Sequence, residues 1–260
     1  MIYNGELQDM QLPDQVYLYQ NIHTLNYQPR YLGHHIEILT TLAESNWQTK
    51  TSLTEKKISK EIYQLLDTSR LSRNVSICVI LRLYASGDYS IHVGEVSFYA
   101  GYVLRSLRPV IKCIEMDVAM SALPSSARKA SYDLAHQMAL VDGYHESIMI
   151  DSSGLVVEDP LRPVATIKNY TLQMPSPSLW SVECMLLEQA AELSGLNVTY
   201  ERISLSDIAN ADEVLTVTYQ GVTSVSRIGE KNYFVSLANK IAKTIETLEL
   251  QNTSQKKINL

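Results

Sequence analysis

The sequence predicts a two-domain protein that combines helices and strands, of the α+β or α/β class. The chain has 260 residues, 45% of them hydrophobic and 19% charged, which is enough to bury two modest cores. Segments with helical periodicity alternate with short runs rich in β-branched and aromatic residues. Near the middle, proline and small residues interrupt this pattern in SALPSSAR, residues 121–128.

The first part of the chain, residues 1–120, is predicted to be a small N-terminal α+β domain. MIYNG predicts a short strand with an Asn-Gly turn, and VYLYQNI predicts a second strand. Helical periodicity begins at Leu32, and a second helix is expected across SLTEKKISKEIYQLLDTS with Thr54 as its N-cap. SICVILRLYASGDY and RPVIKCIEM are expected to form further strands.

Residues 121–128 are expected to be the linker, and residues 129–250 a larger C-terminal domain. The helix SYDLAHQMALVDG would end at Gly143, and SIMIDSSGLVVED predicts two strands around a Ser-Gly turn. VATIKNYTLQMP predicts two strands, SVECMLLEQAAELSG a helix, and DEVLTVTYQGVTSVSRIG two more strands. A long helix is expected in NYFVSLANKIAKTIETLEL, and residues 251–260 are expected to be a frayed polar tail.

Composition excludes several classes of partner. The net charge is −6 and the isoelectric point is about 5.5, without a basic cluster, so neither nucleic acid nor an anionic membrane is an expected partner. No apolar stretch approaches the roughly 20 residues of a membrane helix. The start of the chain lacks the pattern of a signal peptide. Neither the three cysteines nor the six histidines show metal-ligand spacing, so we expect no metal and a cytoplasmic protein.

The second half of the chain carries a family resemblance. The pattern begins in the segment AHQMALVDGYHESIMIDSSGLVVED. Here a helix that ends at a glycine is followed by a pair similar to Leu-Asp, then a turn glycine, then Val-x-Glu. The order continues through LWSVECMLLEQAAELSGLNVTYERISLSDIANADEVLTVTYQGVTSV. This pattern resembles the class IV aminotransferases, which depend on pyridoxal phosphate (PLP) and include branched-chain and D-amino-acid aminotransferases and aminodeoxychorismate lyase. In length the chain is nearest to the lyase.

The resemblance implies a two-domain fold of type IV, like that of D-amino-acid aminotransferase, usually as a homodimer. It implies PLP as cofactor and an amino acid or a chorismate-type molecule as ligand. Glu158 falls at the position of the glutamate that binds the pyridine nitrogen. Ser181, Val182 and Glu183 fall in the phosphate-binding loop, and Thr218 and Tyr219 in the strand that lies beside it.

Several positions depart from the family pattern. Ser125 occupies the position of the lysine that bonds to PLP, and a hydroxyl cannot replace an amine there. The nearest lysine, Lys129, lies about one helical turn later. In the segment 179–184, which aligns with Leu-Pro-Gly-Ile-Thr-Arg, Glu183 replaces the threonine. Ile38 and Pro163 replace an arginine and an asparagine of the family.

Two hypotheses follow from these departures. In the first, the protein has lost standard Schiff-base catalysis with PLP and is a binding or structural descendant of the family. In the alternative, it is an active PLP-dependent aminotransferase or aminodeoxychorismate lyase that uses Lys129.

Overall fold

The computed structural model describes residues 1–9, 15–97, 101–175 and 181–258. Contacts divide the chain into two compact units, Met1–Ala100 with Leu123–Ala127, and Gly101–Ala122 with Arg128–Leu260. Contacts therefore group residues 101–120 with the second unit, whereas the sequence-based boundary places them in the N-terminal domain.

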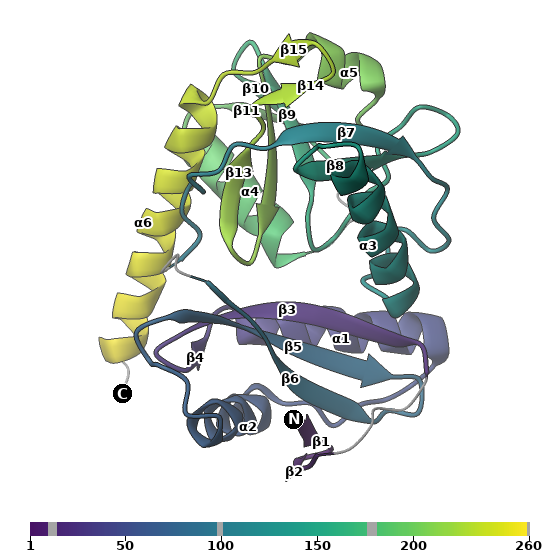
Figure 1. Ribbon diagram of the computed structural model, residues 1–260. Helices are drawn as coiled ribbons and strands as arrows, with labels where there is room; N and C mark the ends of the chain where they lie inside the picture. The colour runs from purple at the N-terminus through teal and green to yellow at the C-terminus, as the bar shows by residue number, and fades with distance from the viewer. Residues whose placement is uncertain (10–14, 98–100, 176–180, 259–260) are drawn as a thin grey trace. The chain divides into compact units, whose positions relative to one another are not determined.

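The first unit is an antiparallel sheet with two helices. Its elements are β1 (Ile2–Tyr3), β2 (Glu6–Leu7), β3 (Tyr17–Leu25), β4 (Gln28–Pro29), α1 (Leu32–Trp47), α2 (Glu55–Thr68), β5 (Ser76–Tyr84) and β6 (Tyr89–Ser97). The strand order is β2-β1-β6-β5-β3-β4, and β3, β5 and β6 are the long strands at its centre (Figure 1).

Local sequence explains the first hairpin and the second helix. Asn4 and Gly5 both have positive φ, 47° and 90°, as a two-residue turn between β1 and β2 requires. The Thr54 hydroxyl accepts a hydrogen bond from the Lys57 N–H at 3.3 Å and caps α2. The predicted Asn-Gly turn and the predicted N-cap are therefore confirmed.

Both helices of the first unit pack on one face of its sheet. Alternate residues of β3 and β5, such as Ile22 and Val79, are buried in one apolar core with Leu39 of α1 and Ile62 of α2. Helical periodicity of 3.6 and strand periodicity of 2 bring these side chains to the same interface.

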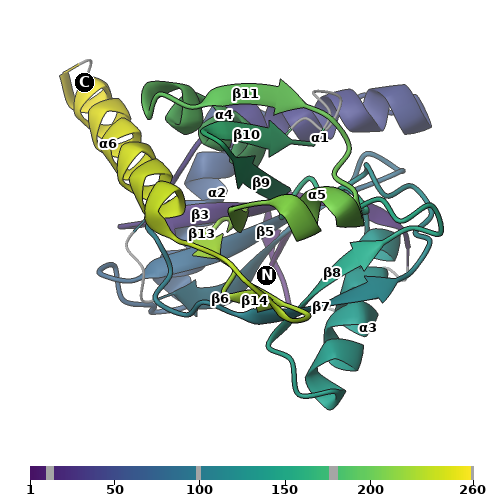
Figure 2. The same ribbon diagram turned by 90° about the horizontal axis from the view of Figure 1, so that it is seen from above.

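The second unit contains two further sheets. Its elements are β7 (Val110–Glu115), α3 (Ser126–Val141), β8 (Glu146–Ile150), β9 (Val164–Lys168), β10 (Thr171–Met174), α4 (Val182–Leu193), β11 (Asn197–Tyr200), α5 (Leu205–Asn210), β12 (Glu213–Thr218), β13 (Gly221–Ser224), β14 (Arg227–Ile228), β15 (Lys231–Asn232) and α6 (Ser236–Ile258). One sheet has the order β11-β10-β9-β12-β13 and the other β15-β14-β7-β8. Figure 2 shows β7 and β8 side by side, as their parallel register requires.

Three predicted elements differ from the structure. The second strand expected in SIMIDSSGLVVED is absent from that described segment, which has only isolated bridges at Leu155 and Val156. Helix α3 begins at Ser126, five residues before the predicted start, because the intervening alanines, Arg128 and Lys129 favour a helix. Helix α6 continues to Ile258, through most of the segment expected to be a frayed tail. Within the described residues, no helix is both long and apolar enough to span a membrane.

Candidate functional site

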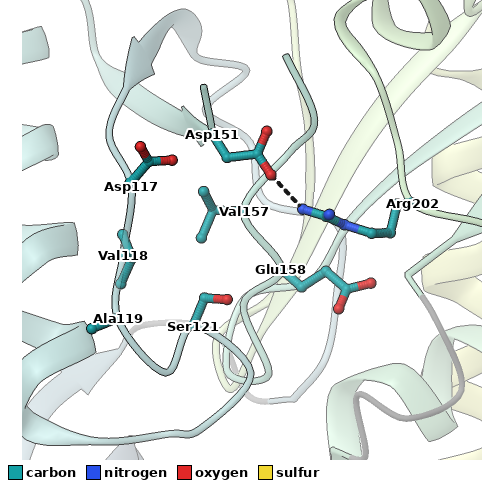
Figure 3. Close-up of a pocket in the computed structure, with 8 residues that line it drawn as sticks. All are labelled: Asp117, Val118, Ala119, Ser121, Asp151, Val157, Glu158 and Arg202. Atoms are coloured by element: carbon teal, nitrogen blue, oxygen red, sulfur yellow. Dashed lines mark hydrogen bonds and ion pairs between the residues drawn. The ribbon is translucent and has the colours of Figure 1, made fainter. Parts of the chain in front are cut away.

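A pocket of about 730 Å³ in the second unit contains the predicted site residue Glu158. Its lining, drawn in Figure 3, consists of Asp117, Val118, Ala119, Ser121, Asp151, Val157, Glu158 and Arg202. Three of these side chains are carboxylates and one is a guanidinium. The walls of the pocket are therefore polar and carry more negative than positive charge. None of the eight is a lysine.

The wall of this pocket is fixed by an ion pair between Asp151 and Arg202. One carboxylate oxygen of Asp151 lies 2.7 Å from Arg202 Nη2 (Figure 3). The other accepts hydrogen bonds from the backbone N–H groups of Ser153 and Leu155, at 3.0 Å each. The bond from Leu155, followed by that from Arg202, lowers the pKa of Asp151. Asp151 therefore stays ionised and holds the turn that follows β8.

A buried ion pair lies next to Glu158 in the chain. Arg128, in the first turn of α3 and 3% exposed, lies 2.8 Å from the carboxylate of Asp159. It also donates to the backbone carbonyls of Ser121 at 2.8 Å and of Glu158 at 3.2 Å. Ser121 and Glu158 both line the pocket, whereas Arg128 does not. Arg128 therefore holds two parts of the pocket wall in place through hydrogen bonds to their backbone.

The predicted phosphate loop forms the start of α4. Ser181 is the N-cap, and its hydroxyl accepts a hydrogen bond from the Cys184 N–H at 3.0 Å. Val182 and Glu183 are the first two helical residues, and both are buried. Leu179 and Trp180, which belong to the same predicted loop, lie outside the described residues.

Glu183 is an acid in an unusual environment. Its side chain is fully buried, and neither carboxyl oxygen has a hydrogen-bond partner. Its pKa is raised from 4.5 to about 8, chiefly by burial and to a smaller extent by the negative charge of Asp159, while its own backbone N–H acts in the opposite direction. At neutral pH the Glu183 carboxyl is therefore mostly protonated and uncharged.

Several of the predicted residues lie close to one another around this helix start. The pKa of the Cys184 thiol is raised to about 12, first by burial and then in part by the charges of Glu183, Glu158 and Asp159. Because such interactions act over short distances in a protein, Glu158 and Asp159 lie near the first turn of α4. The structure thus gathers Glu158 and Ser181–Glu183 within the second unit.

The structure places Lys129 at the surface of α3. Its amine lies 2.5 Å from the Asp133 carboxylate, one turn along the helix, and the two side chains are 42% and 53% exposed. Ser125 lies in the first unit, is 3% exposed, and forms an antiparallel bridge with Leu18 of β3.

The remaining predicted positions are spread over several elements. Thr218, at the end of β12, accepts a hydrogen bond from the Gln220 N–H at 3.2 Å, and the Tyr219 hydroxyl accepts one from the Gln220 side chain at 3.0 Å. Pro163 is buried just before β9. Ile38, at 1% exposure, is a core residue of α1.

Sequence reasoning did not identify Arg128, Asp151 or Arg202 as site residues. Asp151 and Arg202 belong to the motifs that carry the family resemblance, but they are 51 residues apart and nothing in the sequence pairs them. Within the described part of the chain, no group of three or more His, Cys, Asp or Glu side chains is arranged to hold a metal ion.

Comparisons with known proteins agree on one family. The family model described as amino-transferase class IV matches residues 18–228. None of the curated proteins compared with the chain matches its sequence. The fold is similar to that of a protein assigned as a 4-amino-4-deoxychorismate lyase from Legionella pneumophila, with a TM-score of 0.76 and 13% identity over 94% of this chain and 97% of the other.

Two aminotransferase structures show the same fold. A branched-chain aminotransferase from Thermoproteus uzoniensis has a TM-score of 0.77 and 15% identity, covering 96% of this chain and 94% of its own. A hypothetical aminotransferase from Mycobacterium tuberculosis, in its PLP-bound form, has a TM-score of 0.70 and 11% identity, covering 91% and 89%. At these identities the similarity concerns the fold, which is fold-type IV. Since the family model matches most of its length, the chain belongs to the class IV aminotransferase family.

Proposed function

We propose that this protein has lost Schiff-base catalysis with PLP and acts as a small-molecule-binding descendant of the class IV aminotransferases. PLP is the cofactor of that family, and its chemistry requires a lysine amine that bonds to the cofactor aldehyde. The observation that carries the proposal is the environment of Lys129, the lysine nearest to the family position at Ser125.

Lys129 has the surroundings of a solvated surface residue. Its amine forms an ion pair with Asp133 at 2.5 Å, and 42% of its side chain is exposed. A carboxylate partner stabilises the charged ammonium, whereas attack on an aldehyde requires the neutral amine. Catalytic lysines are instead desolvated or placed beside another cation. Ser125 supplies no amine at all.

The start of α4 also does not fit the cofactor. By family resemblance, the phosphate would contact the backbone at Val182 and Glu183. A fully buried carboxyl is already present there, with its pKa raised to about 8. A phosphate dianion placed beside it would disfavour the ionised form of Glu183 still further, and an ionised Glu183 would repel the phosphate. Neither the lysine position nor the start of α4 therefore has the side chains that PLP binding requires.

A binding role is supported by the pocket around Glu158. Its volume, about 730 Å³, lies within the range of small-molecule sites. The ligand class expected from the family is an amino acid or a chorismate-type molecule. We also propose that the protein is a homodimer and is located in the cytoplasm. Size-exclusion chromatography would test the first proposal and cell fractionation the second.

The test is an assay of the purified protein with PLP, an amino donor and a keto-acid acceptor, together with a visible absorbance spectrum. We expect neither amino transfer nor a protein-bound cofactor band. The alternative, an enzyme that uses Lys129, requires activity that Lys129→Ala abolishes. Lys168→Ala, at another exposed lysine, is the matched control. Transfer that Lys129→Ala removes and Lys168→Ala preserves would refute the proposal.

A further inference from the structure

Helix α3 packs against β8 through one face and exposes a row of apolar side chains on another. On the packed face, Ala135 is buried and belongs to one apolar cluster with Met149 of β8. Figure 1 and Figure 2 both show α3 beside β8. On the other face Leu134, Met138 and Val141 are 56%, 44% and 85% exposed. These three residues lie at positions i, i+4 and i+7, so they follow one another along one side of the helix.

No charged side chain interrupts this apolar row. Ala130 extends it by one turn toward the start of α3, and Ser131 and Gln137 lie along its two edges. We call the set formed by Ala130, Ser131, Leu134, Gln137, Met138 and Val141 the outer face of α3. Lys129 and Asp133, which are both partly exposed, pair with each other beside the outer face and leave it uncharged.

Helix α2 shows the arrangement that is usual for a helix with one side in water. Its buried side is mostly apolar, and its exposed side carries Lys56, Lys60 and Asp67. Isolated apolar side chains are common on protein surfaces, but a continuous row of them marks an interaction site. The outer face of α3 therefore has the composition of a contact surface and not that of a solvated one.

Two copies of the outer face are complementary when the two helices run antiparallel about a twofold axis through Leu134. Leu134 then meets Leu134 of the second copy, Ala130 lies level with Met138, and Ala127, in the first turn of α3, lies level with Val141. In both unlike pairs a small side chain meets a large one, which is the pattern that lets facing helices interdigitate. A twofold contact joins the same surface of both copies, so it requires self-complementarity of this kind.

Electrostatics also favour a contact between two copies through this face. The chain has a net charge of −6, so two copies repel each other on average, but every residue of the outer face is uncharged. The polar residues at its edges, Ser131 and Gln137, lie next to the same edges of the second copy and add no charge. In an antiparallel pair the end of one helix also lies beside the start of the other, which is favourable for the helix dipoles.

We infer that the outer face of α3 binds the same face of a second copy of this chain, with the two helices antiparallel about a twofold axis at Leu134. From Ala127 to Val141 the contact is about 21 Å long. One helix pair of this length buries less surface than a typical permanent interface, so we expect association in the micromolar range. The contact involves no PLP chemistry and does not rest on the function proposed above.

The first test is disulfide trapping in the full-length protein. Leu134→Cys places one thiol from each copy at the twofold axis, within the reach of a disulfide bond. Under a mild oxidant this variant should form a covalent dimer at least about tenfold faster than Leu140→Cys, because association raises the effective concentration of the two thiols. Leu140 is the matched control, since it is 43% exposed on the same helix but lies outside the outer face. The wild type measures the background from the native cysteines Cys78, Cys113 and Cys184.

The second test is analytical ultracentrifugation of Leu134→Glu. Two carboxylates then face each other at the axis, so self-association should weaken at least about tenfold relative to the wild type, whereas Leu140→Glu should leave it unchanged. Both side chains are exposed in the single chain, and circular dichroism checks that each variant folds. Equal cross-linking of the two cysteine variants, no cross-linking at Leu134→Cys, or unchanged sedimentation of Leu134→Glu would each overturn the inference. A homodimer formed only through another surface gives this negative result, and since none of these measurements involves PLP, they are separate from the test of the proposed function.

Discussion

The buried acid at the start of α4 makes the stability of this protein depend on pH, and Glu183→Gln should remove that dependence. Glu183 is fully buried, its carboxyl oxygens have no hydrogen-bond partner, and its pKa is raised from 4.5 to about 8. Between these two values the folded state binds a proton that the unfolded state has released. The free energy of unfolding therefore falls as pH rises through this window.

The size of the effect follows from the two pKa values. Each tenfold change in proton affinity corresponds to 1.36 kcal/mol, so Glu183 costs about 5 kcal/mol once the pH exceeds its folded pKa. Between pH 5.5 and 8.5, linkage gives a loss of about 3 kcal/mol from this one group. Glutamine has nearly the same shape and does not titrate, so Glu183→Gln should be more stable than the wild type, and increasingly so at higher pH.

The measurement is urea unfolding of wild type and Glu183→Gln at several pH values between 5.5 and 8.5, followed by circular dichroism. The difference in unfolding free energy between the two proteins isolates Glu183 from every other titrating group. Glu192→Gln, on the exposed side of the same helix, should follow the wild type. A difference between Glu183→Gln and wild type that does not change with pH would refute this reasoning.

Three further substitutions test the packing of the second unit. Gly221→Ala should destabilise by roughly 2–5 kcal/mol, because φ is 118° and a Cβ would lie 2.2 Å from the Val103 carbonyl oxygen. Glu213→Gln should cost about 1–3 kcal/mol, since this buried carboxylate accepts two N–H bonds at the start of α6, at 2.8 Å each. Arg128→Met should cost about 3–5 kcal/mol, because it leaves the Asp159 carboxylate without its partner.

Chemical denaturation at neutral pH measures all three. Gly143→Ala is the control for the glycine prediction, because its φ of 80° is also positive but a Cβ there would contact nothing within 4 Å. It should therefore cost less than Gly221→Ala. For the ion pair, adding Asp159→Asn to Arg128→Met should recover part of the loss. If any of the three single variants has the same free energy of unfolding as the wild type, the prediction for the corresponding contact is wrong.

Local signals in the sequence predicted most of the secondary structure. The Asn4-Gly5 turn and the Thr54 cap are decided by residues within three positions of one another, so no tertiary information is needed. The prediction of a second strand after Gly154 was wrong, and the reason is physical. The Asp151 side chain binds the backbone N–H groups of Ser153 and Leu155, and this competes with a regular ladder.

The candidate site was predictable only in part. Glu158 and Ser181–Glu183 were found because they lie in short motifs whose order in the chain is distinctive. Arg128 was missed because its partner Asp159 is 31 residues away, and a sequence pattern does not pair distant charges. The raised pKa of Glu183 depends on burial from all sides, which the helical position alone does not reveal.

The central claim, loss of the covalent bond to PLP, is tested most directly by chemical trapping. Purified protein would be incubated with excess PLP, reduced with borohydride, digested, and mapped by peptide mass spectrometry. We expect no stoichiometric adduct on any lysine, Lys129 included. A single stoichiometric adduct on Lys129 would contradict it and would identify a working enzyme with a displaced catalytic lysine.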